Sequence, residues 1–108
     1  MEEFSEIKQL DPLLMNPKRL MIVSLLYALG PRTMKQLVES LGLTWGDLDS
    51  NIRRLRDHGI VALRKIPTRS GPRTLVYLTP YGERRFEEFS RVLEKVVERM
   101  RGLREGRR

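Results

Sequence analysis

The sequence predicts a mostly helical α+β domain, and three observations support this prediction. Two short capped helical segments, 33–42 and 44–58, follow one another with only a glycine turn between them. Two strand-like runs, 60–66 and 74–78, then flank a loop with two prolines and a glycine. A last segment repeats apolar residues every three or four positions. In this order the elements form a winged helix-turn-helix domain, with a wing sheet of two or three strands and a long C-terminal dimerisation helix.

Composition and charge indicate one domain with an anionic partner. The chain has 108 residues and no cysteine, so we expect one domain, no disulfide framework and no thiolate metal site. The net charge is +7, and residues 61–79 contain four bases and no acid. Such a basic segment predicts a polyanion, nucleic acid above all. The alternative is a charge-rich surface of the kind found in thermophiles.

The sequence also favours a cytoplasmic protein. The first ten residues, MEEFSEIKQL, are acidic and have no long apolar core, so they do not predict a secretory signal. No apolar run approaches the ~20 residues that a membrane-spanning helix needs. We therefore expect no membrane partner.

Helix signals place the first two segments. Residues 3–10 predict a short amphipathic helix that ends at an Asp-Pro pair. Asn16 and Pro17 begin the next helix as N-cap and first residue, and a Gly-Pro pair at 30–31 ends it. The run between these signals is almost wholly apolar, so we expect this helix to be central.

The helix-turn-helix follows from caps and glycines. Thr33 and Gln36 match a capping box, and Gly42 ends that helix. Thr44 then caps a second helix, which Gly59 ends. A short helix, a tight turn and a second helix in succession are the helix-turn-helix layout.

The last helix begins at Thr79 and Pro80, again as N-cap and first residue. From Phe86 to Leu103 its apolar residues follow at intervals of 3, 4, 3, 4 and 3, which is a heptad seam. Such a seam packs either on its own domain or on a second copy of the chain, and we predict a homodimer. The expected dimerisation residues are Phe4, Ile7, Leu10, Phe86, Phe89, Leu93, Val96 and Met100.

The chain thus reads as a single domain over residues 1–108. We expect the winged-helix core at 11–79, the C-terminal dimerisation helix at 80–103 and a frayed basic tail at 104–108.

The helix at 44–58 has an unusual polar face. Its inward residues share helical spacing: Leu48, Ile52 and Leu55. A step of about 100° per residue then places Gly46, Ser50 and Arg53 outward, with Arg54 beside them. Gly46 indicates either a second surface that approaches closely or a helix start that tolerates glycine.

In a winged helix the second helix enters the major groove, and the hairpin tip reaches the flanking backbone or the minor groove. Arg53 has the reach for a guanine edge, and we expect Asp49 to act by exclusion or by orienting Arg53. Trp45 either packs at the core edge or reaches a base or sugar. The expected DNA contacts are Thr44, Trp45, Asp49, Ser50, Arg53 and Arg54 on the helix, and Thr68, Arg69, Ser70 and Arg73 on the hairpin.

The chain resembles the winged-helix regulators of the MarR/ArsR-like superfamily, in particular the short archaeal and bacterial ones that open with an Asp-Pro signature. The matching residues are Asp11, Pro12, Pro17, Arg19, Leu20 and Ile22, then Leu41-Gly42-Leu43-Thr44, Gly46, Leu48, Arg53, Leu55 and Gly59, and finally GPRTLVYLTPYG at 71–82. The resemblance implies a dimeric transcription regulator with its recognition helix at 44–58 and its wing at 67–73.

Acidic residues on the recognition helix depart from that pattern. Relatives often have asparagine and serine where this chain has Asp47 and Asp49, and Asp57 follows. Carboxylates near DNA phosphates are repelled. They either accept hydrogen bonds from cytosine amino groups or pair with Arg53 and Arg54 along the helix.

Other classes of function fit the sequence poorly. A single histidine beside the helix end, no cysteine and no P-loop or dinucleotide glycine pattern argue against an enzyme. The same scarcity argues against a metal sensor, and we expect no cofactor. The runner-up is a winged-helix protein–protein interaction module with little sequence-specific DNA binding, which the acidic face favours and the basic wing disfavours. The resemblance also implies room for a small-molecule effector, but no residue identifies it.

Overall fold

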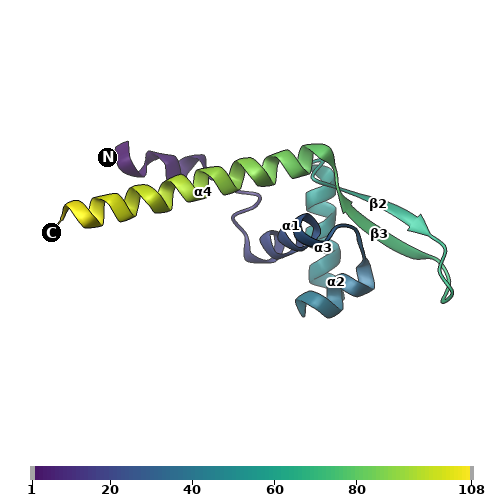
Figure 1. Ribbon diagram of the computed structural model, residues 1–108. Helices are drawn as coiled ribbons and strands as arrows, with labels where there is room; N and C mark the ends of the chain where they lie inside the picture. The colour runs from purple at the N-terminus through teal and green to yellow at the C-terminus, as the bar shows by residue number, and fades with distance from the viewer. Residues whose placement is uncertain (1, 108) are drawn as a thin grey trace.

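The structure, a computed structural model, describes residues 2–107, with side chains from residue 4 onward. Its elements, in chain order, are the 3-10 helix η1 (Glu2–Gln9), α1 (Pro17–Leu29), β1 (Arg32–Thr33), α2 (Met34–Leu41), α3 (Trp45–Asp57), β2 (Val61–Ile66), β3 (Arg73–Leu78) and α4 (Pro80–Gly106). The helices α1 to α3 form a body beneath the start of α4, and the β2–β3 hairpin projects from this body (Figure 1). The predicted winged helix-turn-helix fold is confirmed.

Local capping explains where the helices begin. The side chains of Asn16, Thr33, Thr44 and Thr79 each accept a hydrogen bond from the backbone N–H three residues further on, at 2.9 to 3.1 Å. The side chain of Gln36 closes the predicted capping box by accepting from the Thr33 N–H at 2.9 Å. Each cap satisfies a donor that the helix itself leaves free. All four predicted helix starts are therefore confirmed.

The sheet has three antiparallel strands in the order β1-β3-β2. The hairpin register runs from Val61 opposite Leu78 to Ile66 opposite Arg73. The third strand, β1, has two residues and pairs Arg32 with Val76. The expected loop at 67–73 is one residue shorter than predicted, because Arg73 continues the ladder as the first residue of β3.

The start of α4 is held against the turn that ends α3. The Thr79 N–H donates to the Ile60 carbonyl oxygen at 3.0 Å, and the Thr79 hydroxyl donates to the Gly59 carbonyl oxygen at 2.5 Å. A Cβ at Gly82 would lie 2.0 Å from that Ile60 oxygen, so no larger residue fits there. This close approach sets the direction of α4 relative to α3.

The end of α4 differs from the prediction. We expected residues 104–108 to fray, but the helix continues to Gly106. The last turns contain no proline, and their arginine, methionine, leucine and glutamate residues extend an existing helix at little cost, whereas Gly102 and Gly106 oppose the extension. The 3-10 helix η1 and the last turns of α4 lie at the end of the molecule opposite the hairpin (Figure 1).

The predicted dimerisation residues divide into two groups. Leu10, Phe89 and Val96 are buried in the core of the single chain. Phe86 contacts Tyr27, with ring centroids 4.7 Å apart and the ring planes tilted by 41°, and Met100 is partly buried against the core. The remaining three are exposed: Phe4, Ile7 and Leu93. The seam therefore packs largely on its own domain, with η1 alongside α4, and leaves a smaller apolar strip uncovered.

Candidate nucleic-acid interface

The two faces of α3 are separated as the helical spacing predicts. Its three inward leucine and isoleucine side chains, at 48, 52 and 55, are at most 1% exposed. Ser50, Arg53 and Arg54 are exposed on the other side. Trp45 is 56% exposed, so it does not pack into the core edge. The outer face of α3 is thus open to a partner.

Neither crowding by the described part of the chain nor backbone conformation requires glycine at position 46. A Cβ at this position would meet no atom within 4 Å beyond its chain neighbours and the local helix backbone. Its φ is not positive, so the backbone does not demand glycine either. Glycine here removes a side chain from the first turn of an exposed helix face.

Each acidic residue on α3 faces a cation. Asp49 pairs with Arg53 at 2.9 Å across one helical turn, so the predicted pairing is confirmed at this position. Asp47 instead pairs with Lys18 of α1 at 2.6 Å. The hydrogen bond and the charge of Lys18 lower the pKa of Asp47. Asp57 lies 3.9 Å from Arg56, and no aspartate pairs with Arg54 in the described structure.

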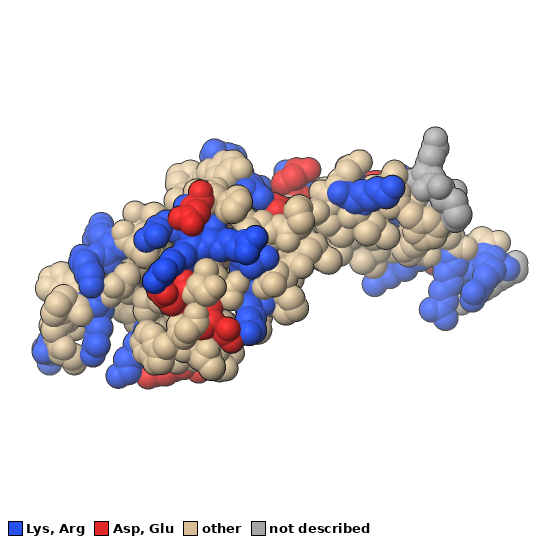
Figure 2. Space-filling model, turned by 180° about the vertical axis from the view of Figure 1, so that it is seen from behind, with Lys and Arg blue, Asp and Glu red and all other residues tan. Residues whose placement is uncertain are grey.

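These pairs reduce the negative field of α3. Figure 2 shows the face opposite that of Figure 1, where acidic side chains lie among basic ones over the body, while basic side chains follow the hairpin. Within the described residues 61–79 the hairpin has no acid to offset its arginines and lysine. The surface potential is therefore mixed on the body and positive on the wing.

The wing tip is a tight turn over residues 68–71. The backbone groups of Thr68 and Gly71 exchange hydrogen bonds at 3.0 and 3.1 Å, and Gly71 has φ +98°. The Thr68 hydroxyl donates to the Gly71 carbonyl oxygen and accepts from the Ser70 N–H. Thr68 and Ser70 thus shape the turn, and the exposed Arg69 side chain is carried at its tip.

A hollow of about 250 Å³ lies between the start of α3 and the base of the wing. Its lining includes Trp45 and Arg73, two predicted contact residues that are 28 positions apart in the sequence, and also Lys35 at the start of α2. Sequence reasoning missed Lys35. Its position in the first turn of the first motif helix was the available signal, because that helix crosses the DNA backbone in helix-turn-helix proteins.

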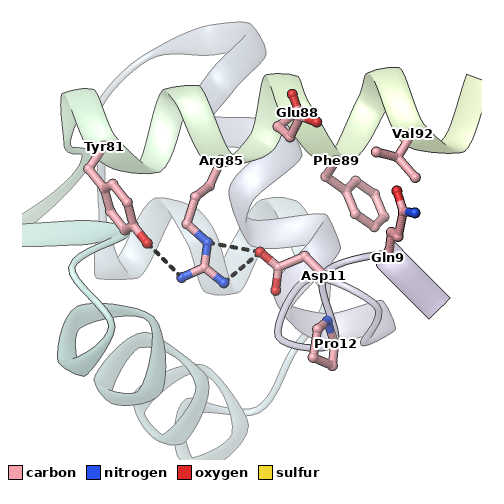
Figure 3. A pocket seen from close by; sticks show the side chains of 8 residues that line it. All are labelled: Gln9, Asp11, Pro12, Tyr81, Arg85, Glu88, Phe89 and Val92. Carbon is pink, nitrogen blue, oxygen red and sulfur yellow. Dashed lines mark hydrogen bonds and ion pairs between the residues drawn. The ribbon is translucent and has the colours of Figure 1, made fainter. Parts of the chain in front are cut away.

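The Asp-Pro signature has a structural role away from this face. Asp11 Oδ2 accepts from Arg85 Nε at 2.8 Å and Nη2 at 2.5 Å, and Arg85 Nη1 also donates to the Tyr81 hydroxyl at 3.3 Å (Figure 3). Asp11 Oδ1 accepts from the Leu13 N–H at 3.0 Å. Burial acts to lower the pKa of Arg85, but the hydrogen bond and charge of Asp11 raise it overall. These bonds attach the segment before α1 to α4.

Comparison with known proteins shows which family the chain belongs to. The model of the winged helix DNA-binding domain matches residues 18–97. The chain belongs to this family. A search of curated proteins finds no match.

Solved structures give the same result. The transcriptional regulator homologue protein from Pyrococcus horikoshii OT3 is 37% identical, with a TM-score of 0.75 over 95% of this chain and 98% of that one. NadR in complex with 4-hydroxyphenylacetate is 25% identical, with a TM-score of 0.65 over 94% of this chain and 72% of that one. The heme sensor protein PefR, in complex with heme and carbon monoxide, shares the fold at 21% identity, with a TM-score of 0.73 over 92% of this chain and 68% of that one.

The expected place among MarR-type transcription regulators is therefore confirmed. The chain is a DNA-binding regulator of transcription, and its family and structural neighbours are regulators rather than enzymes. None of the helices that the structure describes combines the length and the apolar character needed to span a bilayer.

Proposed function

We propose that this protein binds double-stranded DNA sequence-specifically as a homodimer. In this proposal α3 enters the major groove and the wing lies on the flanking backbone or minor groove. One observation carries it. The exposed face of α3 and the acid-free wing are joined by the hollow, whose lining includes Trp45 from α3 and Arg73 from the wing. An α-helix fits the major groove, which is about 12 Å wide.

Arg53 is the side chain best suited to read a base. It lies near the centre of the outer face, is 67% exposed and is tethered by Asp49. A tethered guanidinium loses less rotamer freedom on binding, and its planar fork matches the two acceptors of guanine. Arg69 and Lys35, at the wing tip and at the start of α2, are placed for backbone phosphates.

A homodimer explains the elongated shape of the chain. The radius of gyration is 16.9 Å, compared with about 13 Å for a compact domain of ~100 residues. The elongation comes from the β2–β3 hairpin on one side and, on the other, from α4, which extends beyond the body with η1 beside it (Figure 1). Leu93, Val97 and Leu103 on α4 and Phe4 and Ile7 on η1 are exposed apolar side chains on these two elements. A second copy would cover them and present two recognition helices to two half-sites about one helical turn apart.

The runner-up, a protein-interaction module, loses its main support. It rested on the acidic recognition face, but Asp47, Asp49 and Asp57 each have a cation within 4 Å. An acidic face that is paired within the chain is a weak attractor for a basic partner protein.

The test is binding to random-sequence duplex at two salt concentrations, followed by selection of a preferred site. We expect affinity to fall steeply with salt and a two-fold symmetric site to emerge. Salt-independent or undetectable duplex binding would instead support the protein-interaction module. A duplex scrambled within the selected site is the matched control for sequence preference.

A further inference from the structure

A second hollow, of about 200 Å³, lies on the flank of α3 away from the wing. It is lined by Pro12, Leu13, Arg19, Arg54 and His58. Of these, only Arg54 belongs to the predicted DNA contacts. Three of the five side chains are basic, and the lining includes no acid.

Arg19 is held in place by the elements around it. Its Nε donates to the Leu13 carbonyl oxygen at 2.7 Å, and its Nη1 donates to Asn51 Oδ1 at 3.1 Å. Asn51 is itself anchored, because its Nδ2 donates to the Asp47 carbonyl oxygen at 2.8 Å. The guanidinium is therefore oriented before any ligand arrives, and these bonds leave its Nη2 group available.

Arg54 differs from its neighbours on α3. Arg53 and Arg56 each face an aspartate, whereas Arg54 has no carboxylate partner in the described chain. Burial, and then the positive charge of Arg54, lower the pKa of Arg19. Two guanidinium groups of like charge thus line this hollow.

His58 closes the end of the hollow. Its Nδ1 lies 2.9 Å from the Arg54 carbonyl oxygen, which can only accept, so Nδ1 carries the hydrogen. The negative end of the α3 dipole opposes an anion at this position. The hydrogen bond from His58 satisfies one of the terminal carbonyl groups and so reduces that opposition, and the two guanidinium charges outweigh the remainder.

We propose that Arg19 and Arg54, with His58 at the edge, form a binding site for one phosphate group of the DNA backbone. The positions 47, 51, 54 and 58 follow one another along a single flank of α3, adjacent to its outer face. The DNA strand that borders the major groove entered by α3 would pass along this flank. The inference rests on the proposed function and adds a backbone contact from α1, opposite the contacts of the wing.

The test compares Arg54→Gln with the matched control Arg56→Gln. Both remove one exposed charge from α3, but Arg56 lies about 200° further round the helix and away from the hollow. We expect Arg54→Gln to reduce the salt slope of random-duplex binding by about 1 per protomer, Arg54→Lys to restore it, and Arg56→Gln to leave it unchanged. Thermal melting by circular dichroism checks that each variant is folded.

Equal slopes for Arg54→Gln and Arg56→Gln would overturn this inference while leaving DNA binding intact. If the wild type fails to bind duplex at all, the proposed function fails first. A separate arm measures thermal stabilisation by inorganic phosphate against chloride at equal ionic strength. Stabilisation that Arg54→Gln abolishes, together with an unchanged DNA salt slope, would assign the hollow to a free anion and overturn the backbone contact.

Discussion

The ion pair between Asp49 and Arg53 offers the sharpest test of how α3 reads DNA. Asp49→Ala and Arg53→Ala each remove one half of a pair whose side chains are 52% and 67% exposed. An exposed pair one helical turn apart contributes only ~0.3–0.5 kcal/mol to stability, so both variants should fold and melt almost as the wild type does. Any large effect on DNA binding then reports on recognition.

The two variants should differ in what they lose. Arg53→Ala removes the base contact, which costs ~1–3 kcal/mol of discrimination, or roughly a 5- to 150-fold loss of preference for the best site. Asp49→Ala removes a negative charge from the groove side and frees the arginine. It should raise affinity for random duplex while lowering selectivity, since an untethered guanidinium binds phosphates as readily as bases.

The assay is site selection followed by competition between the selected and the random duplex at one fixed salt concentration. Arg56→Ala serves as the control, because it removes an arginine from the same helix outside the predicted contacts. If wild type, Asp49→Ala and Arg53→Ala return the same site with the same strength, these two residues of α3 do not read the DNA sequence, and the reasoning is refuted.

Three further predictions concern the fold, the wing and the dimer. Gly82→Ala should destabilise the protein by ~1–3 kcal/mol or more, because its Cβ would lie 2.0 Å from a backbone oxygen. Gly46→Ala, by contrast, should leave the melting temperature unchanged or raise it, and should affect only DNA binding, which it weakens. Equal melting temperatures for the Gly82→Ala and Gly46→Ala variants would contradict this prediction. Arg69→Ala should weaken binding to all sequences alike and reduce the salt slope by about one, and a loss on one sequence only would refute a phosphate contact. The variant with both Leu93→Glu and Val97→Glu should sediment as a folded monomer, since these side chains are 37% and 39% exposed in the single chain; a wild type that is already monomeric at micromolar concentration would refute the dimer.

The choice of Val97 for that experiment illustrates what the heptad seam did and did not predict. The spacing from Phe86 onward correctly indicated a continuous apolar stripe on α4. It could not indicate which element covers the stripe, because a residue that packs on η1 and a residue that packs on a second copy look the same in sequence. Val96 is buried in the chain's own core, so its replacement by a charge would unfold the domain and say nothing about a dimer.

The ion pairs on α3 likewise include one that the sequence could predict and one that it could not. The pair between Asp49 and Arg53 spans four residues of one helix and could be predicted from spacing. The partner of Asp47 could not, because Lys18 lies 29 residues away and meets it only through the docking of α1 against α3. The sequence therefore overstated how acidic the recognition face is.

The sequence by itself determined the helix starts, the hairpin, the order of the elements and hence the fold class. Each of these depends on hydrogen bonds or side-chain periodicity within a few residues, which spacing records directly. Only the tertiary structure decided that Trp45 and Arg73 share a hollow, that Arg19 faces Arg54, and that Gly82 must remain glycine. These depend on how the elements pack around a common core, and packing is set by the whole set of buried side chains rather than by any local pattern.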